Sequence, residues 1–73
     1  MSFAAMIPRM TYGDLVRIAE ASPAHRERPQ RAAKLVGVAR DWAHVNGTLA
    51  TASEERIEQF DRLLDWAEGE SEE

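Results

Sequence analysis

Asp41 and His44 come closest, by residue type and spacing, to a catalytic pair. They lie three positions apart, about one helical turn, so the carboxylate could orient the imidazole as a general base. The sequence has no cysteine, no second carboxylate cluster and no glycine-rich phosphate loop to accompany them. His25, the other histidine, lies in a proline-rich stretch. We therefore interpret both histidines as surface or boundary residues, and we expect no enzyme, no cofactor and no metal site.

The charge of the chain is divided between its two halves. Residues 1–40 carry seven Lys or Arg against three acids, a net charge of +4. Residues 41–73 carry two Arg against ten acids, a net charge of −8, so the whole chain of 73 residues has a charge of −4. Such a chain can fold its halves against each other or present two surfaces of opposite sign to a partner.

A run of basic residues enters and follows the middle of the chain. Its members are Arg26, Arg28, Arg31, Lys34 and Arg40. Three interpretations stay open: neutralisation of an acidic third helix, contact with an acidic surface of a partner, and binding to nucleic acid. The first is favoured, because the chain is acidic overall and no face carries Lys and Arg without interruption.

The two tryptophans differ in their predicted surroundings. Trp42 falls on the apolar stripe of the second predicted helix and is expected in the core. Trp66 falls toward the edge of the third stripe, between Asp65 and Glu68. It is either boundary packing or an exposed anchor for a partner, because tryptophan is enriched at binding hot spots.

Start and stop signals predict three helices. Thr11 can cap the first, with Asp14 at its third position, and Pro29 suits the first turn of the second. Gly47 and Gly69 are typical stops for the second and third helices. The predicted spans are 11–21, 29–46 and 52–68, with a connection over 22–29.

The third helix has two competing start signals, and the second contains a glycine. Thr51 with Glu54 fits a capping box, and Ser53 is the competing cap. Gly37 costs the second helix about 1 kcal/mol relative to alanine. We interpret it as a point of close approach between helices.

One apolar face on each predicted helix supplies the core. Val45 continues the stripe of the second helix, whereas Tyr12 lies beside the stripe of the first. No stretch alternates with period two, so no strand is expected. The predicted core is Leu15, Ile18, Leu35, Val38, Trp42, Ile57, Phe60 and Leu64.

The sequence therefore predicts an all-α fold, a small three-helix domain. We expect a flexible arm over 1–10, the helical domain over 11–69 and an acidic tail over 70–73. No run approaches the roughly 20 apolar residues of a membrane span. We expect a monomer in the cytoplasm.

Two runs of the chain carry a resemblance to a known family. They are MSFAAMIPRMTYGDL, from Met1 to Leu15, and EERIEQFDRLLDWAEG, from Glu54 to Gly69. Taken over its full length, the chain resembles the small transcription regulators that lytic Xanthomonas phages direct against host RNA polymerase. The resemblance implies contact with the β′ amino-terminal region and the β flap of the polymerase. It also implies displacement of the σ factor, with loss of promoter recognition, and antitermination.

Residue types suggest which side chains would contact such a partner. Aromatic and arginine anchors dominate many interfaces, whereas rim charges mainly set the association rate. Arg9 and Tyr12 lie at the junction of the arm and the first helix, Arg31 and Lys34 on the basic face, and Trp66 on the acidic helix. A helix-turn-helix DNA-binding domain is the alternative, and the acidity of its would-be recognition helix disfavours it.

We predict that the isolated chain does not bind DNA at physiological salt, because its net charge is −4 and its third helix is acidic. Fluorescence anisotropy with random-sequence duplex measures this directly. Binding at about micromolar affinity or tighter, with a steep salt dependence, would instead favour the helix-turn-helix alternative.

Overall fold

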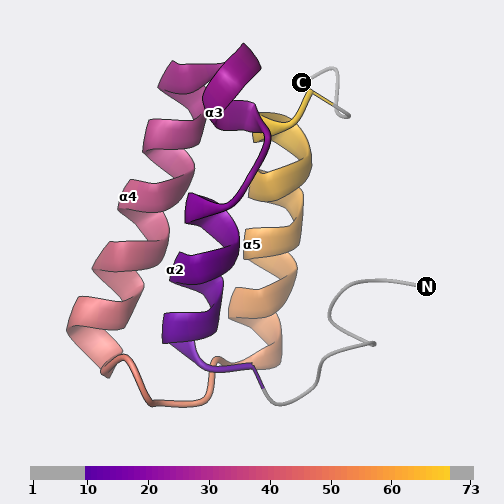
Figure 1. The fold of residues 1–73 in the computed structure, drawn as a ribbon. Helices are drawn as coiled ribbons and strands as arrows, with labels where there is room; N and C mark the ends of the chain where they lie inside the picture. Colours follow the sequence, from indigo (N-terminus) through magenta and orange to yellow (C-terminus); the bar gives the residue numbers. More distant parts are fainter. Residues whose placement is uncertain (1–9, 70–73) are drawn as a thin grey trace.

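The computed structural model describes residues 10–69 and has an all-α fold, which confirms the predicted class (Figure 1). The predicted arm, except for Met10, and the predicted tail lie outside the described residues. Among the described helices, none is long and apolar enough to cross a membrane. The helices are α2 (Tyr12–Glu20), α3 (Ala24–Glu27), α4 (Pro29–Asn46) and α5 (Glu54–Ala67).

The local signals at the ends of α2 and α4 act as predicted. The Thr11 hydroxyl accepts from the Asp14 backbone N–H at 3.1 Å, and the Asp14 carboxylate accepts from the Thr11 N–H at 3.0 Å. This reciprocal pair is a capping box. Pro29 occupies the first turn of α4, where a missing N–H costs nothing. Gly47 ends that helix at φ 100°, a conformation that glycine adopts readily.

The start of α5 differs from the capping box expected at Thr51. Ser53 is the cap, and its hydroxyl accepts from the Arg56 N–H at 3.2 Å. Thr51 instead forms an antiparallel β-bridge with Thr11, the one isolated bridge within residues 10–69. The Ala52 N–H donates to the Met10 carbonyl at 2.7 Å beside it. A long-range backbone pairing therefore holds Thr51 away from the helix, and the competing cap takes over.

The connection over 22–29 contains the short helix α3, so residues 10–69 hold one helix more than predicted for them. The Ser22 hydroxyl accepts from the Ala24 N–H at 3.1 Å, which fixes the first turn of α3. The same hydroxyl donates to the Glu68 carboxylate at 2.9 Å. Ser22 is buried, and through these two bonds it joins the α2–α3 corner to the far end of α5.

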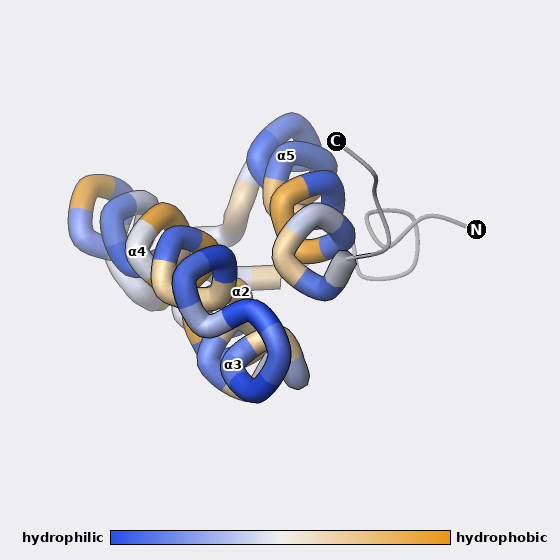
Figure 2. The backbone as a smooth tube through the Cα atoms, turned by 90° about the horizontal axis from the view of Figure 1, so that it is seen from above, coloured by the Kyte–Doolittle hydropathy of each residue, from blue (hydrophilic) through white to orange (hydrophobic). Residues whose placement is uncertain are grey.

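Helices α2, α4 and α5 pack as a three-helix bundle in which α4 contacts both α2 and α5 and runs antiparallel to both (Figures 1 and 2). The loop from α4 to α5 returns along the start of α2. The Tyr12 N–H donates to the Ala50 carbonyl at 3.0 Å, and the Gly13 N–H donates to the Thr48 carbonyl at 2.9 Å. These bonds satisfy the free donors of the first α2 turn and fix the loop in place.

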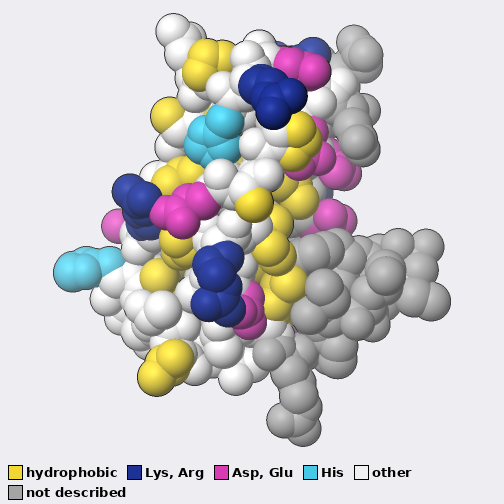
Figure 3. All heavy atoms as spheres, viewed as in Figure 1, with side chains coloured by type: hydrophobic (Ala, Val, Ile, Leu, Met, Phe, Trp, Pro, Cys, Tyr) yellow, Lys and Arg dark blue, Asp and Glu magenta, His cyan; other side chains and the backbone are white. Residues whose placement is uncertain are grey.

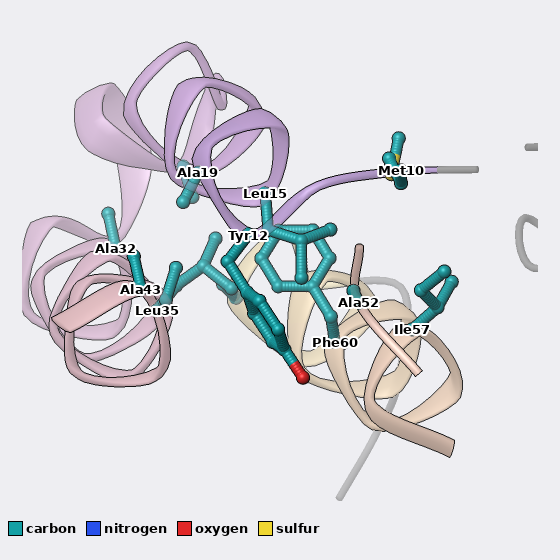
Figure 4. Packing of buried hydrophobic residues seen from close by; sticks show 13 residues of the cluster. Met10, Tyr12, Leu15, Ala19, Ala32, Leu35, Ala43, Ala52, Ile57 and Phe60 are labelled. Carbon is teal, nitrogen blue, oxygen red and sulfur yellow. The ribbon is translucent and has the colours of Figure 1, made fainter. Parts of the chain in front are cut away.

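Half of the predicted core residues are fully buried: Leu15, Leu35, Ile57 and Phe60. Figure 4 shows Tyr12, Leu15 and Phe60 pointing toward one another between the helices. Seven of the thirteen buried hydrophobic residues are alanines. They are Ala19, Ala24, Ala32, Ala39, Ala43, Ala52 and Ala67.

The buried face of α4 is rotated from the predicted one. It consists of Ala32, Leu35, Ala39 and Ala43. The larger predicted members, Val38 and Trp42, are only partly buried, and Val45 is 73% exposed. Ile18 and Leu64 are likewise partly buried against the core. The face of α4 that packs against α2 carries small side chains, because these let the two helices approach closely. The apolar pattern of the sequence does not reveal this close approach.

The arm boundary and the role of Gly37 also need correction. Met10, placed in the arm by the sequence, is 4% exposed and belongs to the core. Gly37 is exposed, and a Cβ built on it would meet no atom within 4 Å. The close approach occurs at Gly13, where a Cβ would lie 2.6 Å from Thr48 Cγ2 and 3.0 Å from the Thr48 carbonyl oxygen.

The two helical glycines should therefore respond oppositely to alanine. Gly37→Ala should raise the free energy of unfolding by up to about 1 kcal/mol, because it removes backbone entropy at an open site. Gly13→Ala should lower it by about 1–3 kcal/mol, because the methyl group overpacks against the Thr48 backbone. Urea unfolding followed by circular dichroism measures both. Shifts in the same direction would contradict the packing described for α2 and the loop.

Candidate protein-binding surface

The five residues expected to contact a partner do not form one surface. Arg9 lies outside the described residues. Tyr12 is 5% exposed and belongs to the core, so the expectation that it stands beside the apolar stripe is wrong. Its ring fills space that α2, α4 and α5 enclose together (Figure 4). The three remaining residues are Arg31, Lys34 and Trp66.

Arg31 and Trp66 come together although 35 positions separate them in sequence. The Arg31 guanidinium lies over the Trp66 ring, 4.9 Å from its centroid. Its Nη1 also donates to the Trp66 carbonyl at 2.8 Å. That carbonyl is one of the last in α5, where a cation also meets the negative end of the helix dipole. Arg31 therefore holds the end of α5 and one face of Trp66 at once.

Lys34 follows Arg31 by one turn of α4 and is exposed. Arg31 and Trp66 are both half-buried, so parts of the stacked pair still reach solvent. We call Arg31, Lys34 and Trp66 together the Arg31–Trp66 surface. It contains three of the five predicted contact residues, and it combines an aromatic ring with two cations.

A second stacked pair joins the same two helices, and the sequence analysis missed it. The Arg56 guanidinium of α5 lies 4.9 Å from the centroid of the Trp42 ring of α4. Arg56 also donates to Gln59 Oε1 at 2.9 Å. Because α4 and α5 are antiparallel, an arginine near the start of each helix stacks on a tryptophan near the end of the other. The similar Arg-to-Trp separations in the two helices are the only sequence signal of this arrangement.

The favoured expectation for the basic run was neutralisation of acids on the third helix. Within residues 10–69 the ion pairs have other partners: Arg17 with Asp14, Arg28 with Glu27, and Arg40 with Glu20. None of these carboxylates belongs to α5. The basic run meets α5 at a ring and a carbonyl instead, so in the described part of the chain that expectation is wrong.

The carboxylates of α2 and α5 have opposite pKa shifts. Hydrogen bonds from Thr11, first from its backbone and then from its side chain, lower the pKa of Asp14, and Arg17 adds to this. Burial raises the pKa of Asp61, and the nearby Asp65 charge raises it further, partly offset by Arg62. The folded state therefore disfavours the charged form of the Asp61 side chain.

An open groove of about 440 Å³ lies between α2 and α4. Figure 3 shows this face, where apolar side chains lie beside basic and acidic side chains that contact one another. It is separate from the Arg31–Trp66 surface, because no residue belongs to both. Its lining residues are Gly13, Val16, Arg17, Arg40, Ala43, His44 and Thr48.

The last turn of α4 and the loop that follows it present the two most exposed large apolar side chains of the described part. Val45 is 73% exposed and Leu49 is 89% exposed. They lie in the stretch 42–53, which contains no Asp, Glu, Lys or Arg in a chain that is 30% charged. Sequence reasoning missed Leu49, although this uncharged stretch could have indicated it.

Both histidines were predicted at the surface or its boundary, and both are exposed. His25 Nε2 lies 3.0 Å from the Ala19 carbonyl oxygen, and His44 lines the groove. Over residues 10–69, no group of three or more His, Asp or Glu side chains is placed to hold a metal ion.

The stacked Arg31 and Trp66 side chains should be energetically coupled. A double-mutant cycle with Arg31→Met and Trp66→Leu should give a coupling energy of about 0.5–1 kcal/mol, the usual range for a partly exposed cation–π pair. Chemical denaturation supplies the four free energies of unfolding. Arg40→Met with Trp66→Leu is the matched control and should show no coupling, because Arg40 pairs with Glu20. Equal coupling in both cycles would contradict a specific contact.

Asp61→Asn and Asp14→Asn should have opposite effects. The raised pKa of Asp61 means that its contribution to stability is present below the unfolded pKa and is lost as pH rises through the folded one. Asp61→Asn should therefore stabilise the protein at neutral pH. The lowered pKa of Asp14 means that its contribution is present above the unfolded pKa and is lost as pH falls, so Asp14→Asn should destabilise. Both differences should shrink in urea titrations near pH 3. Pairs of curves that stay parallel with pH would contradict these assignments.

No protein-family model, no curated protein and no solved structure matches the chain.

Proposed function

We propose that this protein regulates transcription by binding host RNA polymerase and blocking σ-dependent promoter recognition, without modifying the enzyme chemically. The partner comes from the resemblance of the chain to small phage regulators. The single observation that supports it is the Arg31–Trp66 surface, where a partly exposed tryptophan, its stacked arginine and the exposed Lys34 one turn along α4 lie together. Such residues are the usual anchors of protein interfaces.

The geometry favours binding because the anchor is already ordered. Arg31 is held by the Trp66 carbonyl and ring, so little side-chain freedom remains to be lost on association. The Ser22–Glu68 hydrogen bond at 2.9 Å fixes the same end of α5. Exposed Lys34 adds a charge that can accelerate encounter with an acidic surface.

The proposed site of action is the cytoplasm of the host cell, with one monomer bound to each polymerase. By resemblance, the contacted regions are the β′ amino-terminal region and the β flap. Antitermination is the second proposed effect of the same binding.

The alternative, a helix-turn-helix DNA-binding regulator, would require α5 to approach phosphates. Glu54 and Glu55 occupy its first turn, and Glu58 follows one turn later. These carboxylates would repel a DNA backbone where a recognition helix normally enters the groove. No observation in the structure favours this alternative over a protein partner.

Variants of the Arg31–Trp66 surface should separate anchoring from steering. Trp66→Ala should weaken polymerase binding mainly through faster dissociation, whereas Lys34→Glu should mainly slow association and flatten its salt dependence. Surface plasmon resonance with immobilised holoenzyme measures both rates. Arg62→Glu, the same charge change at an exposed position of α5, is the control and should leave both rates near those of the wild type.

Abortive initiation on a σ-dependent promoter, with stoichiometric protein and polymerase from the proper host, tests the proposal itself. We expect wild-type protein to inhibit and Trp66→Ala to inhibit less at equal concentration. Thermal melts confirm that each variant is folded at the assay temperature. Unchanged transcription, together with separate elution of the two proteins on gel filtration, would refute the proposed function.

A further inference from the structure

The groove between α2 and α4 has an apolar floor built from small side chains. Val16 and Ala43 form it, together with Gly13, which has no side chain to fill the space. With a volume of about 440 Å³, the groove is large enough for an aliphatic side chain and the chain segment that carries it. The floor is therefore suited to an apolar anchor rather than to a wholly polar ligand.

Every ionisable side chain that lines the groove is basic, although the whole chain has a net charge of −4. Arg17 and Arg40 stand on opposite walls, one on α2 and one on α4, and His44 lies one turn beyond Arg40. The Arg17 and Arg40 side chains are 76% and 64% exposed. Each guanidinium has five donors, so binding one carboxylate leaves others available to a second.

Two carboxylates outside the lining hold these arginines in place. Asp14 pairs with Arg17, and Glu20 pairs with Arg40. Asp14 is itself fixed by the capping box with Thr11. The same carboxylates offset much of the positive charge near the groove, so a polyanion such as nucleic acid gains little there. A segment with one or two carboxylates beside an apolar residue fits the charges better.

The loop at the end of the groove extends the apolar surface. Thr48 lines the groove, and the adjacent Leu49 is 89% exposed. Two hydrogen bonds fix the loop to α2: the Gly13 N–H donates to the Thr48 carbonyl at 2.9 Å, and the Tyr12 N–H donates to the Ala50 carbonyl at 3.0 Å. An exposed leucine on a fixed loop can contact a partner with little loss of conformational entropy.

From these observations we infer a second docking site, the α2–α4 groove with Leu49, whose ligand is an acidic protein segment that carries an aliphatic side chain. The aliphatic group lies over Val16 and Ala43, and the carboxylates of the segment accept hydrogen bonds from Arg17 and Arg40. This site goes beyond the proposed polymerase contact, because it shares no residue with the Arg31–Trp66 surface.

A display selection with a random dodecapeptide library on the immobilised full-length protein tests the site without polymerase. We expect enriched peptides to combine Asp or Glu with Leu, Ile or Val. Their amide shift changes on the labelled protein should centre on Gly13, Ala43 and Thr48. The double variant Arg17→Gln/Arg40→Gln should bind the best peptide about tenfold more weakly, since two charge-assisted contacts are lost.

The control is Arg26→Gln/Arg62→Gln, which removes two exposed arginines outside the groove and should keep wild-type affinity. Leu49→Asn, at a position too exposed to matter for folding, should also weaken binding. Absence of enrichment, enrichment of peptides without acids, or equal affinity for all variants would overturn the inference. Tighter binding of a single-stranded DNA oligomer than of the peptides would overturn it in favour of a polyanion site. None of these outcomes depends on whether polymerase binds.

Discussion

The close approach of α2 to α4 is the constraint on which the rest of the structure depends. Alanines on the facing surface of α4, namely Ala32, Ala39 and Ala43, leave room for the backbone of α2. Because small side chains bury little apolar area, this contact sets the spacing of the two helices but contributes little to the free energy of unfolding. The larger share of burial must come from elsewhere. It comes from Leu15, Leu35, Ile57 and Phe60, the largest fully buried side chains.

Helix α5 is attached differently, through large side chains and polar contacts at its far end. Phe60 inserts toward α2 and α4 (Figure 4). Two stacked Arg–Trp pairs join α4 to α5 at opposite ends. The end of α5 is held by the Arg31 bond to the Trp66 carbonyl, and Ser22 holds Glu68. A Cβ at Gly69 would lie 2.5 Å from the Arg28 guanidinium carbon, and its φ of 80° favours glycine independently. A chain without disulfides thus secures its last helix by side chains from its middle.

This attachment links stability to the proposed binding. Arg31 and Trp66 hold α5 and are also the proposed anchors, so a variant at either position changes both properties. Lys34 is the exposed member of the same surface and gives the cleaner test of binding. The groove on the α2–α4 side is a separate surface, because none of its lining residues belongs to the Arg31–Trp66 surface. The molecule thus presents an aromatic and basic face and, separately, an apolar groove with basic walls.

The sequence by itself determined the features that depend on neighbours within one helical turn. The Thr11–Asp14 capping box, the Pro29 start, the Gly47 stop and the all-α class all follow from local hydrogen bonding and backbone preference. Tertiary structure decided which face of α4 is buried, because periodicity marks an apolar stripe but not the distance to the helix opposite. It also decided the burial of Tyr12, the choice of Ser53 over Thr51 as a cap, and the meeting of Arg31 with Trp66. Each of these depends on groups distant in sequence, and their contacts exist only once α2, α4 and α5 have closed around one core.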